Sequence, residues 1–234
     1  MKWQIEYKLG MIAATAAVTL VVGTLYTSGL KADDNQDEED KVERGLSIAP
    51  VPLNLNGKDR QLVGLGSYIV NGQIDCNGCH SMGPQTEFAP SGNPYLLPPI
   101  FSGKKQINQA TYLGGGRDFG PLGPPDNPGS HIMSRNLTPD KTGLPEGGRP
   151  FSEFLQIIRT GIDLDKQHAA TCSLNVTTNC VPFPFDGTKL QIMPWPAFQN
   201  MTDHDLEAIY EYLSAIPCIE GPMDPTNPLH NDCH

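Results

Sequence analysis

The clearest helical pattern in the chain lies within residues 59–70. Leu62, Leu65 and Ile69 recur at helical spacing, and Gly66 leaves a flat position on the same side. A glycine inside a helix costs about 1 kcal/mol relative to alanine. We therefore expect another helix to pack closely against Gly66.

Two further helices are expected later in the chain. Apolar residues form a stripe along 203–215, and Thr202 stands before it as the N-cap. A shorter helix is expected over about 153–160, with Ser152 as its cap and Gly161 at its end. Because no strand pattern is evident, the sequence predicts a mostly α-helical fold.

The stretch 83–129 is rich in turn-forming residues, with nine Gly and nine Pro. A loop of this length without secondary structure is uncommon inside a compact domain, but a large bound cofactor can organise it. The whole chain has 234 residues, of which 38% are hydrophobic, with 24 Gly and 22 Pro. These values favour one loop-rich domain, expected at 59–217, over two small ones.

The N-terminal residues differ from the rest of the chain. An apolar run over 9–30 follows Lys2 and Lys8 and precedes small residues. This order is typical of a secretory signal peptide, here 1–32 with cleavage after Ala32. The run also reaches the ~20 residues that span a bilayer, so an uncleaved membrane anchor is the alternative. Either interpretation places the remaining chain in the periplasm.

Charge is concentrated after this run. The segment 33–44, "DDNQDEEDKVER", carries seven acids and two bases, and we interpret 33–58 as an acidic linker. The whole chain has a net charge of −10. Nucleic-acid binding needs a basic surface and is therefore disfavoured. The acidity allows docking to basic patches on protein partners, although it also serves solubility alone.

Six cysteines are present in a chain that we expect to be exported. An oxidising compartment permits disulfides. If Cys76 and Cys79 hold a cofactor, the other four allow three pairings. Short loops favour one bond between Cys172 and Cys180 and a second between Cys218 and Cys233. The second bond would hold the C-terminal tail, 218–234.

The segment 76–80, "CNGCH", carries the most specific chemistry. Thiols at Cys76 and Cys79 are spaced to bond covalently to the two vinyl groups of one porphyrin, and His80 then presents its imidazole to the iron. A zinc site would need a second ligand pair at metal spacing, and a redox dithiol would need a βαβ context. The sequence predicts one covalently bound haem c.

The second iron ligand has to lie elsewhere in the chain. Met82 is too close to His80 to reach the other porphyrin face. Met193 stands in "LQIMPWPAFQNMT", where two prolines stiffen the backbone, and it is the preferred ligand. Met201 is a candidate hydrophobic staple of the last helix. Met133, a histidine or an open site are the alternatives.

A helix, CxxCH, a Met-Pro loop and a last helix that ends in "YL" follow in this order. This order resembles the class I cytochrome c family. In that family the first and last helices cross at a glycine and an aromatic residue, which correspond to Gly66 and Tyr210 here. The resemblance covers about residues 60–216 and implies that fold, with long Gly/Pro-rich loops around one haem.

One segment is similar to a narrower group. Residues 134–163, "SRNLTPDKTGLPEGGRPFSEFLQIIRTGID", are similar to the haem domains in cytochrome subunits of periplasmic alcohol and aldehyde dehydrogenases. Two departures stand out. Those subunits often carry three haem motifs and this chain has one, and Phe151 stands where the group has tryptophan.

The cofactor prediction assigns roles to individual residues. His80 and Met193 are expected to ligate the iron, and a six-coordinate iron argues against peroxidase or oxygen chemistry. Arg135 and Trp195 are candidates for hydrogen bonds to the haem propionates. Asn136 is a third candidate, and the alternative, which we favour, is that it organises a turn before Pro139.

These expectations describe a periplasmic, soluble or membrane-anchored monohaem cytochrome c that is not itself an enzyme. Its partners would be redox proteins: a dehydrogenase or a quinol-oxidising complex as electron donor, and a terminal oxidase or another acceptor. One alternative is a fixed haem relay in a respiratory complex, to which the N-terminal run would anchor it. The other is a haem enzyme or gas-binding protein with a displaceable sixth ligand.

Overall fold

The structure is a computed structural model that describes residues 36–100, 105–122, 131–164, 170–178, 180–222 and 229–234. The candidate signal peptide or anchor, 1–32, lies outside the described residues. The chain divides into two compact units, Met1–Lys41 and Val42–His234. In the first unit residues 36–41 are helical, and the second unit is described below.

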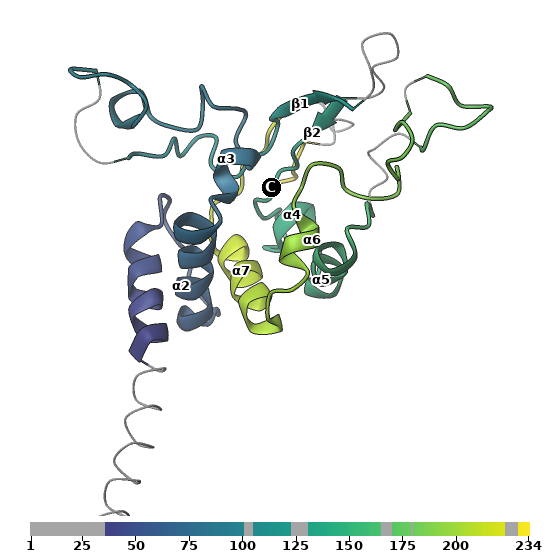
Figure 1. Cartoon of the computed structure of the whole chain (residues 1–234). Coiled ribbons are helices and arrows are strands. Elements are labelled where there is room, and N and C mark those ends of the chain that lie inside the picture. Colours follow the sequence, from purple (N-terminus) through teal and green to yellow (C-terminus); the bar gives the residue numbers. More distant parts are fainter. Residues whose placement is uncertain (1–35, 101–104, 123–130, 165–169, 179, 223–228) are drawn as a thin grey trace, which may run out of the picture. The chain divides into compact units, whose positions relative to one another are not determined.

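Helices dominate the second unit, and a small antiparallel sheet of two strands accompanies them (Figure 1). This confirms the expectation of an α-rich fold. None of the helices within the described ranges is long and apolar enough to cross a membrane. In chain order the elements are α2 (Arg60–Tyr68), the π-helix η1 (Ile69–Gln73), α3 (Cys76–His80), the 3₁₀-helix η2 (Pro90–Gly92), β1 (Asp118–Pro121), β2 (His131–Met133), α4 (Pro145–Gly148), α5 (Phe151–Thr160), α6 (Trp195–Phe198) and α7 (Asp203–Ala215).

The core forms where α2 packs against α7 (Figure 1). Gly66 permits this contact, because a Cβ atom there would overlap the carbonyl oxygen of Ala208 and lie 2.7 Å from Cβ of Tyr212. The aromatic residue at the crossing is therefore Tyr212. Tyr210, which the family resemblance placed there, packs its ring edge-to-face on Phe151 at a centroid distance of 5.2 Å. Residues 208 and 212 are four apart and share a face of α7, whereas Tyr210 points elsewhere.

The long Gly/Pro-rich stretch is tied to this crossing by Tyr112, which is 1% exposed. Its hydroxyl donates to Oδ1 of Asn71 at 2.5 Å and lies 2.7 Å from the hydroxyl of Tyr212. Asn71 Nδ2 in turn donates to the Tyr212 hydroxyl at 3.0 Å. Since buried polar groups need partners, this closed network holds one point of the loop in the core without secondary structure.

Helix α7 begins as the sequence predicted. The backbone N–H of Asp205 donates to Oγ1 of Thr202 at 3.0 Å, and the Thr202 hydroxyl donates to the Asp205 carboxylate at 2.7 Å. Thr202 has extended backbone angles, as an N-cap requires. The cap and the apolar stripe together define both ends of the helix.

Helix α5 starts earlier than expected. Pro150 is the N-cap, and its carbonyl accepts from the N–H groups of Glu153 at 3.0 Å and Phe154 at 3.1 Å. Ser152 is therefore a residue of the helix and not its cap, because the fixed φ of proline already suits a helix start. The helix ends at Gly161, which adopts the left-handed conformation with φ of 67°.

Part of the segment interpreted as an acidic linker belongs to the folded unit. Residues 42–48 are helical, and Val42 is 1% exposed within the hydrophobic core. A Cβ atom on Gly64 would lie 2.6 Å from Cγ1 of Val42, so this helix packs closely on α2. The Ser67 hydroxyl donates to the carbonyl of Gly45 at 2.7 Å. The acidic composition of the segment suggested a linker because the contacts of Val42 are made with residues distant in sequence.

Both expected disulfides are present, Cys172–Cys180 and Cys218–Cys233, which confirms the pairing predicted from short loops. The second closes a loop between residues 15 apart in sequence and holds the C-terminal tail. Such a crosslink stabilises a fold chiefly by reducing the freedom of the unfolded chain.

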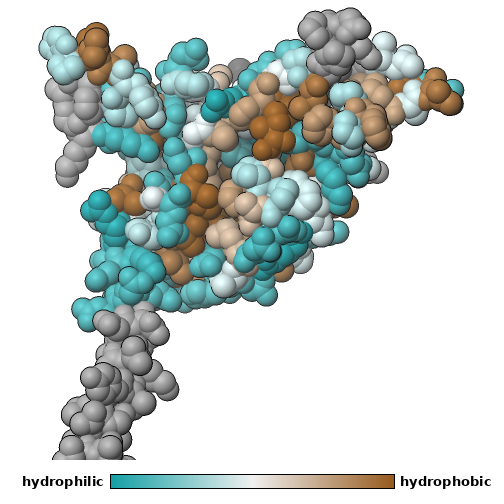
Figure 2. Space-filling model, in the orientation of Figure 1, coloured by the Kyte–Doolittle hydropathy of each residue, from teal (hydrophilic) through white to brown (hydrophobic). Residues whose placement is uncertain are grey.

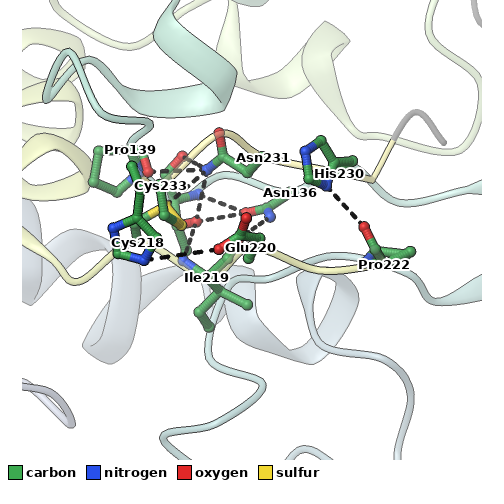
Figure 3. Close-up of polar contacts among 11 residues, drawn as sticks. Asn136, Pro139, Cys218, Ile219, Glu220, Pro222, His230, Asn231 and Cys233 are labelled. Atoms are coloured by element: carbon green, nitrogen blue, oxygen red, sulfur yellow. Dashed lines mark hydrogen bonds and ion pairs between the residues drawn. A yellow bond between two sulfur atoms is a disulfide. The ribbon is translucent and has the colours of Figure 1, made fainter. Parts of the chain in front are cut away.

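Hydrogen bonds also hold the C-terminal tail against the segment 136–139 (Figure 3). Asn231 is 2% exposed, and its Nδ2 donates to the carbonyls of Pro139 at 2.9 Å and Thr138 at 3.1 Å. The N–H of Ile219 donates to the Thr138 hydroxyl at 3.0 Å, and Nδ2 of Asn136 donates to the carbonyl of Ile219 at 2.8 Å. Described parts of the tail therefore pack as an integral piece of the domain.

Candidate functional site

A large apolar cavity lies beside the α2–α7 core. It contains about 1220 Å³ of empty space, including the part open to solvent. Hydrophobic residues gather on the visible face beside β1 and β2 and between α2 and α7 (Figure 2). Apolar walls come from α5 and α7 through Phe154, Ile157, Ile158, Leu206, Ile209 and Leu213.

The cavity brings together residues that are far apart in sequence. Cys76, Cys79 and His80 line it from α3, and Met193 lines it from the segment before α6. Arg135 also lines it. Five of the six residues expected to hold a cofactor therefore face one cavity, and the sixth is Trp195.

His80 is oriented by the backbone. Its Nδ1 lies 2.8 Å from the carbonyl oxygen of Arg135. A carbonyl can only accept, so Nδ1 carries the proton and Nε2 keeps its lone pair. Burial lowers the pKa of His80. The hydrogen bond to the Arg135 carbonyl raises this pKa, and the nearby Arg135 charge lowers it. A neutral imidazole anchored through Nδ1 is the usual state of a metal-binding histidine.

The two cysteines of the motif remain thiols. Cys76 and Cys79 are free, whereas the other four cysteines of the chain form disulfides. Burial, with smaller contributions from Asp75 and Cys79, raises the pKa of Cys76 to about 12. Redox dithiols and metal thiolates need a lowered pKa. Within the described ranges, no three His, Cys, Asp or Glu side chains gather as a metal site.

Backbone strain gathers at the same cavity. Among the described residues, four other than glycine have positive φ, and three of them line the cavity: Asp75, Glu146 and Ile192. Asp75 and Ile192 directly precede Cys76 and Met193. A β-branched residue such as Ile192, with φ of 70°, is a rare occupant of this region. Strained residues of this kind concentrate at functional sites, where the surrounding fold enforces them.

Met193 sits in a compact turn. Its N–H donates to the carbonyl of Gln191 at 2.7 Å, and its own carbonyl accepts from the N–H of Trp195 at 2.9 Å. Met133 and Met201 line the cavity as well. Met82 is 63% exposed and is not among the residues that line the cavity. Three thioethers therefore share the cavity with His80.

The two candidate propionate donors differ in position. Arg135 pairs with the Asp163 carboxylate, and the two side chains are 12% and 1% exposed. Trp195 is not among the residues that line the cavity. Its indole N–H donates to the carbonyl of Leu190 at 3.3 Å. Its ring lies so close to Gly161 that a Cβ atom at position 161 would overlap it. Trp195 thus supports the wall from outside.

Asn136 organises a turn, as interpreted from the sequence. Its Oδ1 accepts from the N–H of Thr138 at 3.0 Å and from the Thr138 hydroxyl at 2.7 Å. Its Nδ2 is used by the C-terminal tail. All of these contacts are structural, and Asn136 does not line the cavity.

Glu146 is a cavity residue that sequence reasoning missed. It lines the cavity with a side chain that is 10% exposed. The sequence "PEGG" signals a turn, in which a glutamate is expected to face solvent. Its burial depends on packing between segments that are distant in sequence.

Comparison of the chain with protein-family models, with curated proteins and with solved structures found no match.

The ion pair between Arg135 and Asp163 leads to a stability prediction. Asp163→Asn leaves the Arg135 charge buried without its carboxylate, and breaking a buried pair typically costs about 3–5 kcal/mol. We expect a loss of about 3 kcal/mol in the free energy of unfolding, measured by urea denaturation. The control is Asp232→Asn, which removes an exposed pair with Lys141 and should leave the midpoint nearly unchanged. Equal midpoints for the two variants would contradict the prediction.

Proposed function

We propose that this protein is a monohaem c-type cytochrome with a class I cytochrome c fold, which carries single electrons in the periplasm. One observation carries the proposal: the CxxCH motif and Met193, 113 positions after His80, line the same apolar cavity. Two free thiols, an oriented neutral imidazole and a thioether are the donor set that a covalently bound haem needs.

The residues would act as follows. Cys76 and Cys79 would hold the porphyrin through thioether bonds, and His80, through Nε2, and Met193 would ligate the iron. When bound, the haem supplies the one-electron couple Fe(III)/Fe(II). The protein contributes burial, ligand choice and orientation. The apolar walls would shield the bound group from water.

Electron transfer fits this arrangement better than catalysis on a bound substrate. With two protein ligands, His80 and Met193, the iron would have no open position for oxygen or peroxide. The partners would be redox proteins, namely a dehydrogenase or quinol-oxidising complex as donor and a terminal oxidase or similar acceptor. An acidic carrier would dock on basic patches, and its complexes would weaken as ionic strength rises.

A fixed haem relay in a respiratory complex is the second candidate. The apolar run 9–30 favours it, since this run is long enough to anchor the chain beside such a complex. The two candidates separate on cell fractionation. A relay should remain with membranes after washing at high salt, whereas a soluble carrier should appear in the periplasmic extract.

Mass spectrometry tests the haem attachment. The chain is expressed in cells that attach c-type haem and is then digested. We expect the peptide that contains 76–80 to carry the mass of one haem. Cys76→Ser together with Cys79→Ser should abolish the attachment, whereas Cys172→Ser together with Cys180→Ser should retain it. A disulfide between Cys76 and Cys79 in the wild-type peptide, with no haem, would refute the proposal.

A further inference from the structure

Glu146 places a buried carboxyl group in the wall of the cavity. Its side chain is 10% exposed and lines the same cavity as His80 and Met193. Carboxylates are seldom buried unless they are paired or do chemistry. The roles proposed above do not use Glu146, so its position needs another explanation.

The backbone at Glu146 adopts an unfavourable conformation. Its φ and ψ of 52° and 46° are left-handed, a conformation that residues with a Cβ atom rarely adopt. Gly147 and Gly148 follow with φ of 73° and 92°, which glycine adopts without this penalty. A glycine at position 146 would relieve the strain, yet the sequence has a side chain that enters the cavity wall. An enforced conformation of this kind points to function.

The arginines beside Glu146 also pair with other carboxylates. Nε of Arg149 lies 3.5 Å from its carboxylate, while Nη1 of Arg149 is 2.7 Å from Glu153. Arg135 is paired with Asp163. Glu146 therefore shares both neighbouring guanidinium groups with other carboxylates. Burial raises the pKa of Glu146; Arg149 and Arg135 oppose this rise, and Asp163 and Glu153 add to it.

We propose that Glu146 binds one proton when the protein accepts an electron and releases it when the electron leaves, so that the protein carries both together. This inference rests on the proposed haem function. In the balanced step the redox donor supplies one electron and the solvent supplies one proton. Fe(III) becomes Fe(II) and the Glu146 carboxylate becomes a carboxylic acid. Both changes reverse at the acceptor.

Electrostatics gives the sign of the coupling. An added electron makes the cavity more negative, and in a poorly solvated site this favours protonation of a nearby carboxylate. The pKa of Glu146 is therefore higher in the reduced protein than in the oxidised one. Between these two values the midpoint potential falls as pH rises. Since a tenfold change in an equilibrium constant is 59 mV for one electron, a fully coupled proton lowers the potential by about 59 mV per pH unit.

The test is a potentiometric titration of the haem-loaded protein over about two pH units on either side of neutrality. We expect a pH window in which the wild-type slope approaches the one-proton limit, and Glu146→Gln to flatten it to less than about a third of that value. Glu153→Gln is the matched control. It removes a second carboxyl group from Arg149, so it should keep the slope and move the window to lower pH. A slope that survives in Glu146→Gln overturns the inference.

A measurement on the wild type alone tests the inference even if the Glu146→Gln variant fails to fold. Reduction in weakly buffered solution, followed with a pH indicator, should take up close to one proton within the window. No uptake, or a potential that does not change with pH, overturns the Glu146 inference while the haem function stands. Absence of the haem absorption bands in the purified protein overturns both, so the two failures are distinguishable.

Discussion

Gly66→Ala is expected to lower the free energy of unfolding by at least about 3 kcal/mol, near the upper end of the cost of overpacking. The added Cβ atom would overlap the carbonyl oxygen of Ala208 and approach Cβ of Tyr212 to 2.7 Å. A backbone oxygen cannot turn aside as a flexible side chain can. Helices α2 and α7 would have to separate, which would also strain the hydrogen bonds among Tyr112, Asn71 and Tyr212.

Gly72→Ala is the matched control for this prediction. It makes the same change in η1, where the nearest atom to an added Cβ is Cδ1 of Ile48 at 3.5 Å, an ordinary contact. Since alanine favours helices over glycine, we expect a change within about 1 kcal/mol and of stabilising sign. Urea denaturation followed by circular dichroism compares the two midpoints. Similar midpoints would mean that the α2–α7 contact does not require a glycine.

Met193→Leu is expected to lower the midpoint potential of the haem-loaded protein by on the order of 0.2 V, a fraction of the ~0.8 V range that axial ligands span. Leucine conserves volume but has no sulfur, so the change removes the proposed ligand with little disturbance of packing. A vacated position should also let carbon monoxide bind the reduced protein. Potentiometry and absorption spectra before and after addition of the gas measure both effects.

The cavity itself supplies the controls for this substitution. Met133 and Met201 also line it, and Met133→Leu and Met201→Leu should leave both the potential and the gas binding as in the wild type. If one of these variants, and not Met193→Leu, shows the large shift, that methionine is the sixth ligand. If none does, the electron-carrier proposal loses its main distinction from a haem enzyme with an open or displaceable site.

Features that depend on neighbouring residues could be predicted from the sequence. Helix α7 and its Thr202 cap followed from local spacing, because a cap acts within one turn. The disulfides Cys172–Cys180 and Cys218–Cys233 followed from short loops. The CxxCH motif also needs only adjacent positions to indicate its chemistry. The start of α5 was wrong by two residues, since Pro150 and Ser152 both offered a plausible beginning.

Features that depend on contacts between distant parts of the chain could not be predicted from the sequence. An α-rich fold, the disulfide pairing and the CxxCH motif could be recognised from the sequence, because all three are encoded within short windows. Three features became visible in the folded structure alone: Tyr212 meets Gly66, Val42 joins the core, and Glu146 lines the cavity. Burial is set by what packs against a residue from elsewhere in the chain, and no local pattern of polar and apolar positions carries that information.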